Sequence, residues 1–288
     1  MKAIYRREVS AYFNSMTGWI FVAAVTVFIG IYFLAYNLFQ GYTYFSYALS
    51  STLMVFLILV PMLTMRSLAE ERHTRTDQLL LTSPASIPAV VLGKYFAMLT
   101  VLAVPVLLAG LCPLIIRLNG TAHLRADYAC LLAYFLLGAV EIAVGLLISA
   151  MTESQIIAAV GTFCTLLVLH LWDGLVNFLP TSASGSLSGS IVALILICFL
   201  LGALSGNWKL SGGALAVSAL AVVCLYLRDS SAFEGLLPEL LGKFSLLDTF
   251  SGFAYDHVFD ITGTLLYLSL IAVLVFLTVQ VLQKRRWN

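Results

Sequence analysis

Long apolar runs separated by short polar segments occupy most of the chain after residue 17. A helix needs about 20 mostly apolar residues to cross the hydrocarbon core of a bilayer. Eight runs have this character, although the sixth and seventh are short. The eight predicted membrane-spanning helices are Gly18–Leu38, Tyr47–Thr64, Tyr95–Ile116, Tyr128–Ala150, Ile156–Leu175, Ile191–Leu204, Gly213–Leu227 and Ile261–Leu282.

The two short runs leave an alternative open for residues 191–227. If they do not both cross, the chain has six spans and residues 191–227 form a re-entrant or interfacial hairpin. The domain organisation is otherwise simple, with one transmembrane domain over residues 18–288 preceded by the segment 1–17.

Residues 1–17 carry a different pattern, in which apolar and polar side chains alternate at helical spacing. One face holds Met1, Tyr5, Val9 and Tyr12, and the other holds Arg6, Arg7, Ser10 and Asn14. Such a helix lies in the membrane interface with its cations toward anionic lipid. It serves either as an anchor or as an elbow that passes motion to the first span.

The segment 66–92 contains the most polar stretch of the chain. Glu70 to Gln78 are all polar or charged, so they cannot lie in hydrocarbon. Glu71 and Arg75 are four residues apart, a favourable helical spacing. Ser83-Pro84 then ends the helix, because the residue before proline avoids the α conformation. The pattern predicts a short charged helix over Ala69–Leu81.

The segment 228–260 between the last two predicted spans is amphipathic. Apolar residues from Phe233 to Leu247 recur every three or four positions, which predicts a helix on or in the outer leaflet. Pro238 is expected to kink or divide it.

Composition agrees with this pattern. Hydrophobic residues make up 61% of the 288 residues and charged residues only 10%, far below the roughly 25% charged residues of a soluble domain. We therefore predict an all-α, polytopic membrane protein. The net charge of +1 gives no basic field for nucleic acid.

The Lys and Arg residues are distributed unevenly between the two sides of the predicted topology. With a cytoplasmic N-terminus, eleven of the fifteen lie on the cytoplasmic side. Because cytoplasmic loops are enriched in Lys and Arg, both termini are predicted to be cytoplasmic. The eleven are Lys2, Arg6, Arg7, Arg66, Arg72, Arg75, Lys94, Lys209, Lys284, Arg285 and Arg286.

Little of the sequence indicates chemistry. Gly93-Lys94 and Gly242-Lys243 lack the rest of a Walker A motif, so no ATPase site, cofactor site or metal site is predicted. Glu141 is the clearest ionisable residue inside a predicted span, and such residues are functional candidates. It is either a structural carboxyl or the proton site of a secondary transporter, which is the alternative function. A membrane enzyme would need a cluster of acids, bases or metal ligands that the sequence does not offer.

The charged segment and its surroundings resemble a known family. Met65-Arg66, Ala69-Glu70-Glu71-Arg72, Thr76 and Leu79-Leu80-Leu81-Thr82-Ser83-Pro84 are similar to the coupling-helix region of type-2 ABC exporter permeases. The resemblance is greatest to the branch of gliding-motility-associated ABC permeases. It extends over residues 1–175 and 244–288, while Arg75 stands where that family usually has Gly and Gln78 where it usually has Glu.

The resemblance implies a permease subunit of an ATP-driven exporter in a bacterial cytoplasmic membrane. Its partners would be an ABC ATPase subunit, which binds the ATP, and a second permease copy or a related permease. The residues expected to dock the ATPase are Glu70, Glu71, Arg72, Arg75, Thr76 and Asp77. Residues 191–227 lie outside the family's usual six-span core and would be an extra hairpin.

Overall fold

The computed structural model of the chain describes residues 1–75, 86–183, 185–189, 191, 195, 235–257 and 259–287. These residues contain helices and no strand, so the predicted all-α class is confirmed for them. The chain divides into two units, one formed by Met1–His170 with Thr249–Asn288 and the other by Leu171–Asp248.

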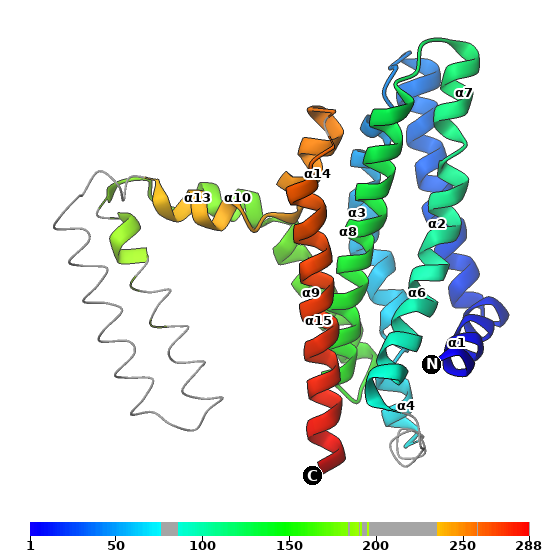
Figure 1. Cartoon of the computed structure of the whole chain (residues 1–288), viewed down its shortest axis with the longest axis vertical. Helices are drawn as coiled ribbons and strands as arrows, with labels where there is room; N and C mark the ends of the chain where they lie inside the picture. The colour runs from blue at the N-terminus through cyan, green and yellow to red at the C-terminus, as the bar shows by residue number, and fades with distance from the viewer. Residues whose placement is uncertain are drawn as a thin grey trace. The chain divides into compact units, whose positions relative to one another are not determined.

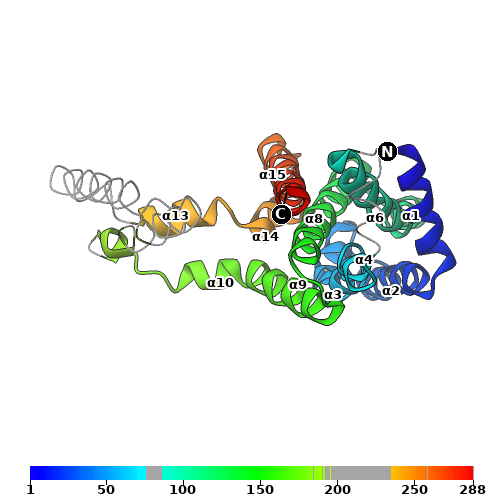
Figure 2. The ribbon, with the colours of Figure 1, turned by 90° about the horizontal axis from the view of Figure 1, so that it is seen from below.

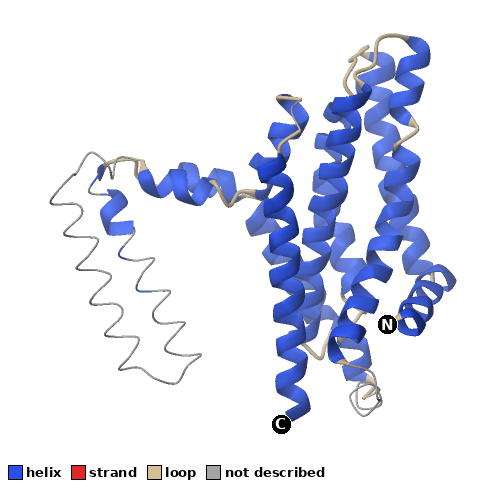
Figure 3. Cartoon of the chain, viewed as in Figure 1, coloured by secondary structure: helices blue, strands red, loops and turns tan. Residues whose placement is uncertain are grey.

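The first unit is a bundle of long helices (Figures 1 and 3). Its helices are α1 (Lys2–Asn14), α2 (Met16–Phe33) continued by the π-helical η1 (Leu34–Phe39), α3 (Ser46–Thr64), α4 (Ala69–His73), α6 (Ile87–Ala109), α7 (Cys112–Asn119), α8 (Leu124–Met151), α9 (Gln155–His170) and α15 (Ile261–Trp287). The boundary between the two units falls within α14 (Leu246–Tyr255). In Figure 1, α2, α3, α6, α8 and α15 run side by side along the bundle, while α1 lies across its lower end. α9 packs against α3 and α8 and is inclined to the bundle axis, as Figure 2 shows.

Five of the helical segments are long and apolar enough to cross a membrane. They are Met16–Phe39, Ser46–His73, Ile87–Asn119, Leu124–Met151 and Ile261–Lys284. They correspond to the first four predicted spans and the last one, which supports a multi-pass membrane protein. The structure does not confirm the count of eight, because the predicted spans Ile191–Leu204 and Gly213–Leu227 lie outside the described residues apart from Ile191 and Ile195.

Two predicted spans have different bounds in the structure. The predicted fifth span, Ile156–Leu175, is wrong at its end, because α9 stops at His170. The backbone of Leu171 leaves the helical conformation where the polar residues His170 and Asp173 interrupt the apolar run. The predicted third span is broken after Ala109, and α7 then begins at Cys112 with Pro113 in its first turn, where a missing amide costs little.

α8 is the central helix of the first unit and packs against α3, α6, α9 and α15. Glycines on α8 permit close approach of its neighbours. A Cβ at Gly138 would lie 2.9 Å from a Leu102 methyl of α6, and a Cβ at Gly145 would overlap the side chain of Thr64 in α3. The core is therefore built by small residues on α8 that admit larger ones from adjacent helices.

The chain direction places several segments at one end of the bundle. α1, α4 and the end of α15 lie at the lower end in Figure 1, whereas α7 lies at the upper end. α1 and the end of α15 thus lie at the end of the first unit that carries α4.

The second unit contains α10 (Trp172–Asn177) and α13 (Leu236–Gly242) among its described residues. The indole Nε1 of Trp172 donates a hydrogen bond to the Leu241 carbonyl oxygen at 2.9 Å, which links the two helices. The predicted segment 228–260 is divided after Gly242. Pro238 lies in the first turn of α13, where proline is tolerated, so it does not mark the break.

Candidate functional site

α4 is a short charged helix directly after α3, and its start is capped by a distant residue. The amides of Leu68 and Ala69 donate hydrogen bonds to Oγ of Ser149, at 3.2 and 3.1 Å. Ser149 lies near the end of α8 and is fully buried. A helix leaves its first amides without internal partners, and a side-chain oxygen there stabilises the helix. Ser149 therefore fixes the start of α4 to α8.

Arg72 fastens the same helix to the turn between α8 and α9. Its side chain is only 8% exposed, and one guanidinium nitrogen donates to the Thr152 carbonyl oxygen at 2.8 Å. The second terminal nitrogen is buried and has no hydrogen-bond partner in the described part of the chain. Arg72 is thus directed into the protein.

A cluster of four charged side chains joins α4 to α1 and α6, and we call it the coupling cluster (Arg7, Glu8, Glu71 and Lys94). Lys94 is at its centre and only 2% exposed. Its Nζ lies 2.8 Å from a Glu71 carboxylate oxygen and 3.3 Å from one of Glu8, and it also donates to the Ser67 carbonyl oxygen at 2.8 Å.

Arg7 completes the coupling cluster from its exposed side. One guanidinium nitrogen lies 2.7 Å from Glu8 and 3.3 Å from Glu71. The cluster therefore balances two cations against two carboxylates. Burial of Lys94 requires this balance, because an unpaired buried charge is very costly.

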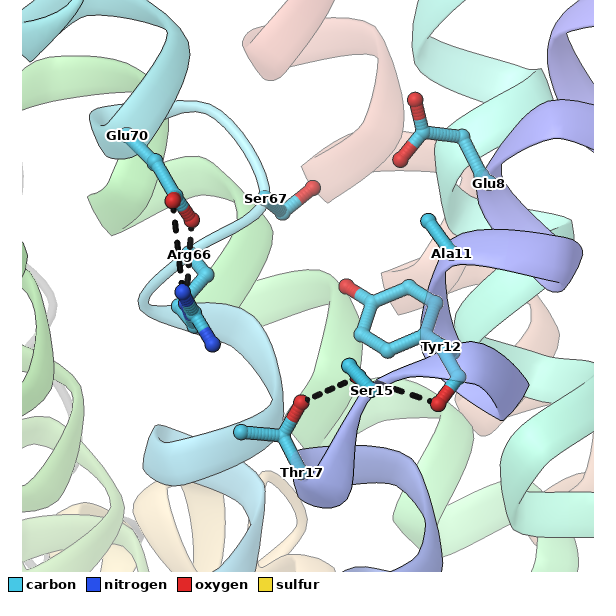
Figure 4. Close-up of a pocket in the computed structure, with 8 residues that line it drawn as sticks. All are labelled: Glu8, Ala11, Tyr12, Ser15, Thr17, Arg66, Ser67 and Glu70. Carbon is cyan, nitrogen blue, oxygen red and sulfur yellow. Dashed lines mark hydrogen bonds and ion pairs between the residues drawn. The ribbon is translucent and has the colours of Figure 1, made fainter.

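A pocket of about 240 Å³ opens beside the coupling cluster, and Figure 4 shows the residues around it. Arg66 and Glu70 form a two-point ion pair on one side, with nitrogen–oxygen distances of 2.9 and 3.3 Å. Tyr12 lies on the other side and donates its hydroxyl to the Leu63 carbonyl oxygen at 3.3 Å. Burial raises the pKa of Tyr12 above its ordinary value, so the hydroxyl stays a neutral donor. The full lining is Glu8, Ala11, Tyr12, Ser15, Thr17, Arg66, Ser67 and Glu70.

The predicted docking residues separate into three groups. Glu71 and Arg72 are turned toward the protein's own helices, whereas Glu70 is partly exposed at the pocket and Arg75 is exposed. Thr76 and Asp77 lie outside the described residues.

α4 is also shorter than the predicted helix Ala69–Leu81. It ends at His73, and Arg75 has a φ of +56°. A non-glycine residue in this left-handed region interrupts a helix.

Several residues of the site were not predicted from the sequence. Ser149 and Thr152 act through backbone contacts with a segment 80 residues away and give no local signal. Two further residues of the site, Glu8 and Lys94, do have a recognisable signal in the sequence. Glu8 is the only acidic residue before Glu70, and Lys94 interrupts an otherwise apolar run. An ionisable residue in such a run needs a partner.

Glu141, the predicted intramembrane candidate, lies on α8 and is only 1% exposed. The structure supplies a partner that the sequence did not indicate, since a Glu141 carboxylate oxygen lies 3.6 Å from His170 Nε2. His170 Nδ1 lies 3.1 Å from the Leu166 carbonyl oxygen and donates to it, because a carbonyl only accepts. Nε2 is therefore left to face Glu141, and the pair joins α8 to the end of α9.

The comparison with protein families agrees with the fold and the position of the site. Residues 36–171 match the model of a family described as ABC-2 family transporter protein. The matched region contains α3, α4, α6, α8 and α9, and thus most of the contacts that hold α4. No curated protein matches the chain.

The family match and the apolar helices together support a multi-pass membrane transporter of the ABC-2 permease type. The match does not support the alternative of a proton-coupled secondary transporter that uses Glu141.

Proposed function

We propose that this chain is the membrane subunit of an ABC exporter and moves its substrate with energy from ATP hydrolysed by a separate subunit. The family match supports the class. The observation that carries the proposal is the fixation of α4, whose start is capped by Ser149 of α8 while His73 and Arg75 at its end are exposed. A short charged helix held in this way suits the transfer of force from a partner to the bundle.

In this mechanism the exposed end of α4 receives the ATPase, and charged side chains there give register and complementarity. Glu70 and Arg75 are the docking residues, whereas Glu71 and Arg72 transmit. Movement of α4 passes through Ser149 and Arg72 to the junction of α8 and α9. It passes through Lys94 to α6 and α1.

We further propose that the end of the bundle carrying α4 faces the cytoplasm of a bacterium. Cations are concentrated there, as expected for the cytoplasmic side. Within the first unit this end holds Lys2, Arg6, Arg7, Arg66, Arg72, Arg75, Lys94 and Lys284, whereas the opposite end holds Arg117 and Arg125.

The working transporter would contain two permeases and two ATPase subunits. The second permease is another copy of this chain or a related chain, and the chain would belong to the branch of gliding-motility-associated permeases. The resemblances in residues 65–86 support this finer assignment.

Co-purification with a candidate ABC ATPase subunit, co-expressed with the permease, tests the docking residues. The variant Glu70→Ala/Arg75→Ala should lower the amount of bound ATPase, because it removes a partly exposed charge of α4 and the exposed charge that follows the helix. Glu71→Gln should leave association intact and lower permease-dependent ATP hydrolysis, because Glu71 contacts Lys94 and Arg7 inside the protein.

Lys243→Ala is the control, since Lys243 is an exposed cation of the second unit. The docking assignment is wrong if Glu70→Ala/Arg75→Ala retains the ATPase and coupled transport as fully as Lys243→Ala does.

A further inference from the structure

An apolar groove lies between α1 and the pair α6 and α8, and we call it the elbow groove. It is a broadly open groove with a volume of about 700 Å³. Figure 2, which views the bundle from its lower end, shows α1 beside α6. The groove is lined by Met1, Lys2, Tyr5, Phe96, Leu99, Thr100, Ala103 and Phe135.

A second apolar groove of about 550 Å³ adjoins the first and extends between α6, α8 and α15. The two share Phe96, Leu99 and Phe135, which form a ridge between them. Among the described residues that line the two grooves, Lys2 is the single Lys, Arg, Asp or Glu. The surface therefore combines two apolar hollows with one cation at its lower end.

A second cation lies beside the first on the same helix. Arg6 is four residues after Lys2, so the two side chains lie on one face of α1, and both are exposed. Neither is paired with a carboxylate in the described part of the chain, in contrast with Arg7 and Lys94 nearby. Their charge is available to a ligand.

The position of α1 over the groove is fixed by a hydrogen bond. The hydroxyls of Tyr5 and Thr100 are 2.9 Å apart, and Thr100 donates its own proton to the Phe96 carbonyl oxygen at 2.8 Å. Tyr5 is consequently the donor to Thr100. This bond connects the charged helix to the wall of the groove, so cation and hollow keep their relative positions.

We propose that the elbow groove binds an anionic phospholipid from the surrounding leaflet. Its acyl chains lie in the two hollows on either side of Phe96 and Phe135, and its phosphate contacts Lys2 and Arg6. Burial of acyl carbons and attraction of basic residues to anionic lipid are both favourable. An apolar helix from a second chain would fill the hollows but would leave the two cations without a counter-charge.

Binding is tested with the full purified chain in nanodiscs of phosphatidylcholine, with and without phosphatidylglycerol. The chain is released from the nanodiscs, and the lipids that stay bound to it are counted by native mass spectrometry. We expect phosphatidylglycerol to be enriched over phosphatidylcholine. Lys2→Ala/Arg6→Ala should lower this preference by roughly thirtyfold, as expected for the loss of two cations near a membrane surface.

Two comparisons separate the effect of charge on lipid binding from the effect of the shape of the groove. Arg117→Ala/Arg125→Ala removes two exposed cations from the opposite end of the bundle and should keep the preference. Ala103→Phe fills the groove and should lower retention of both lipids, while Ile58→Phe, at an exposed position of α3 outside the grooves, should not.

Three results would overturn the proposal. They are equal binding of the two lipids by the unaltered chain, an unchanged preference in Lys2→Ala/Arg6→Ala, and unchanged lipid retention in Ala103→Phe. Inorganic phosphate is added as a competitor, and displacement of phosphatidylglycerol by phosphate alone would also contradict a site that requires the acyl chains.

Discussion

At the scale of single residues, the account depends on side chains whose surroundings differ from what their type suggests. Arg72 and Lys94 are cations in the interior, and each donates to a backbone carbonyl oxygen of another segment, Arg72 to Thr152 and Lys94 to Ser67. The sequence pattern placed Arg72 in a charged segment and therefore predicted that it lies at the surface. The pattern could not show where the Arg72 side chain points, because the Thr152 carbonyl lies beside it only in the folded chain.

Arg75 provides a prediction at this scale. Its φ of +56° is unfavourable for a residue with a Cβ. Arg75→Gly should stabilise the end of α4 by up to about 1 kcal/mol, because relief of about 1–2 kcal/mol exceeds the roughly 0.4–1 kcal/mol entropic cost of glycine in the unfolded chain. Hydrogen exchange of the α4 amides should become slower.

Thr74→Gly is the control for this change, since Thr74 has an ordinary φ of −86°. It should speed exchange or leave it unchanged. Faster exchange in Arg75→Gly than in the unaltered chain would show that the left-handed conformation is not a source of strain.

The Glu141–His170 pair gives a second prediction. Both side chains are buried, and the pair joins α8 to α9. Glu141→Gln and His170→Ala should each lower the free energy of unfolding by about 1–3 kcal/mol, because each leaves a buried polar partner behind. The double variant should lose less than the sum, with a coupling energy of about 0.5–3 kcal/mol. Unfolding in denaturing detergent measures all three.

Additive losses would mean that the two side chains do not interact. This interaction was not evident in the sequence, since Glu141 and His170 lie on different helices and no spacing rule connects them.

At the scale of elements, the long apolar helices were predictable and the contacts of α4 were not. The predicted span Tyr47–Thr64 differs from α3 (Ser46–Thr64) by one residue, because the composition of a membrane span is enough to identify it. The end of α9 was not predicted correctly, because one histidine and one aspartate near the end of a span are compatible with either a break or an interfacial end. Contacts such as Ser149 with Leu68 depend on tertiary structure.

Removal of the Ser149 hydroxyl tests whether this side chain caps α4. Ser149→Ala should destabilise the start of α4 by about 1 kcal/mol, the usual cost of a lost helix cap. Hydrogen exchange at the Leu68 and Ala69 amides should become several-fold faster, with α8 itself unaffected.

Ser50→Ala is the matched control, because the Ser50 hydroxyl bonds only within α3, to the Ser46 carbonyl oxygen. If both variants leave the Leu68 and Ala69 amides equally protected, Ser149 does not hold α4.

The packing of α1 on α6 gives a further prediction. A Cβ at Gly93 would lie 3.1 Å from an Ile4 methyl carbon and 3.4 Å from the Tyr5 nitrogen. Gly93→Leu should therefore displace α1 and cost about 1–3 kcal/mol, as overpacking does. Thermal unfolding measures the loss, and faster proteolysis within α1 locates it.

Gly30→Leu is the corresponding control on α2, where a Cβ meets no atom of the described chain within 4 Å. An equal loss of stability in both variants would show that the contact with α1 is not the cause.

At the scale of the whole molecule, helix order and charge distribution define a bundle with its termini and α4 at the same end. The sequence predicted that both termini are cytoplasmic, from the number of spans and the asymmetry of Lys and Arg, and the side of the membrane stays a prediction. The coupling cluster is the feature that the sequence could not provide, because its members come from residues 7, 8, 71 and 94. It connects α4 to α1 and to α6.

The central claim is that the coupling cluster transmits movement from a docked ATPase to the bundle. The variant Glu8→Gln/Glu71→Gln/Lys94→Met tests it directly, because it removes the ion pairs and leaves no unpaired buried charge. The measurement is ATP hydrolysis by the ATPase subunit co-reconstituted with the permease in proteoliposomes. We predict that the variant still binds the ATPase in full amount, while permease-dependent hydrolysis falls by about tenfold, equivalent to about 1.4 kcal/mol in the barrier. Hydrolysis at the unaltered rate with the ATPase fully bound would contradict the account.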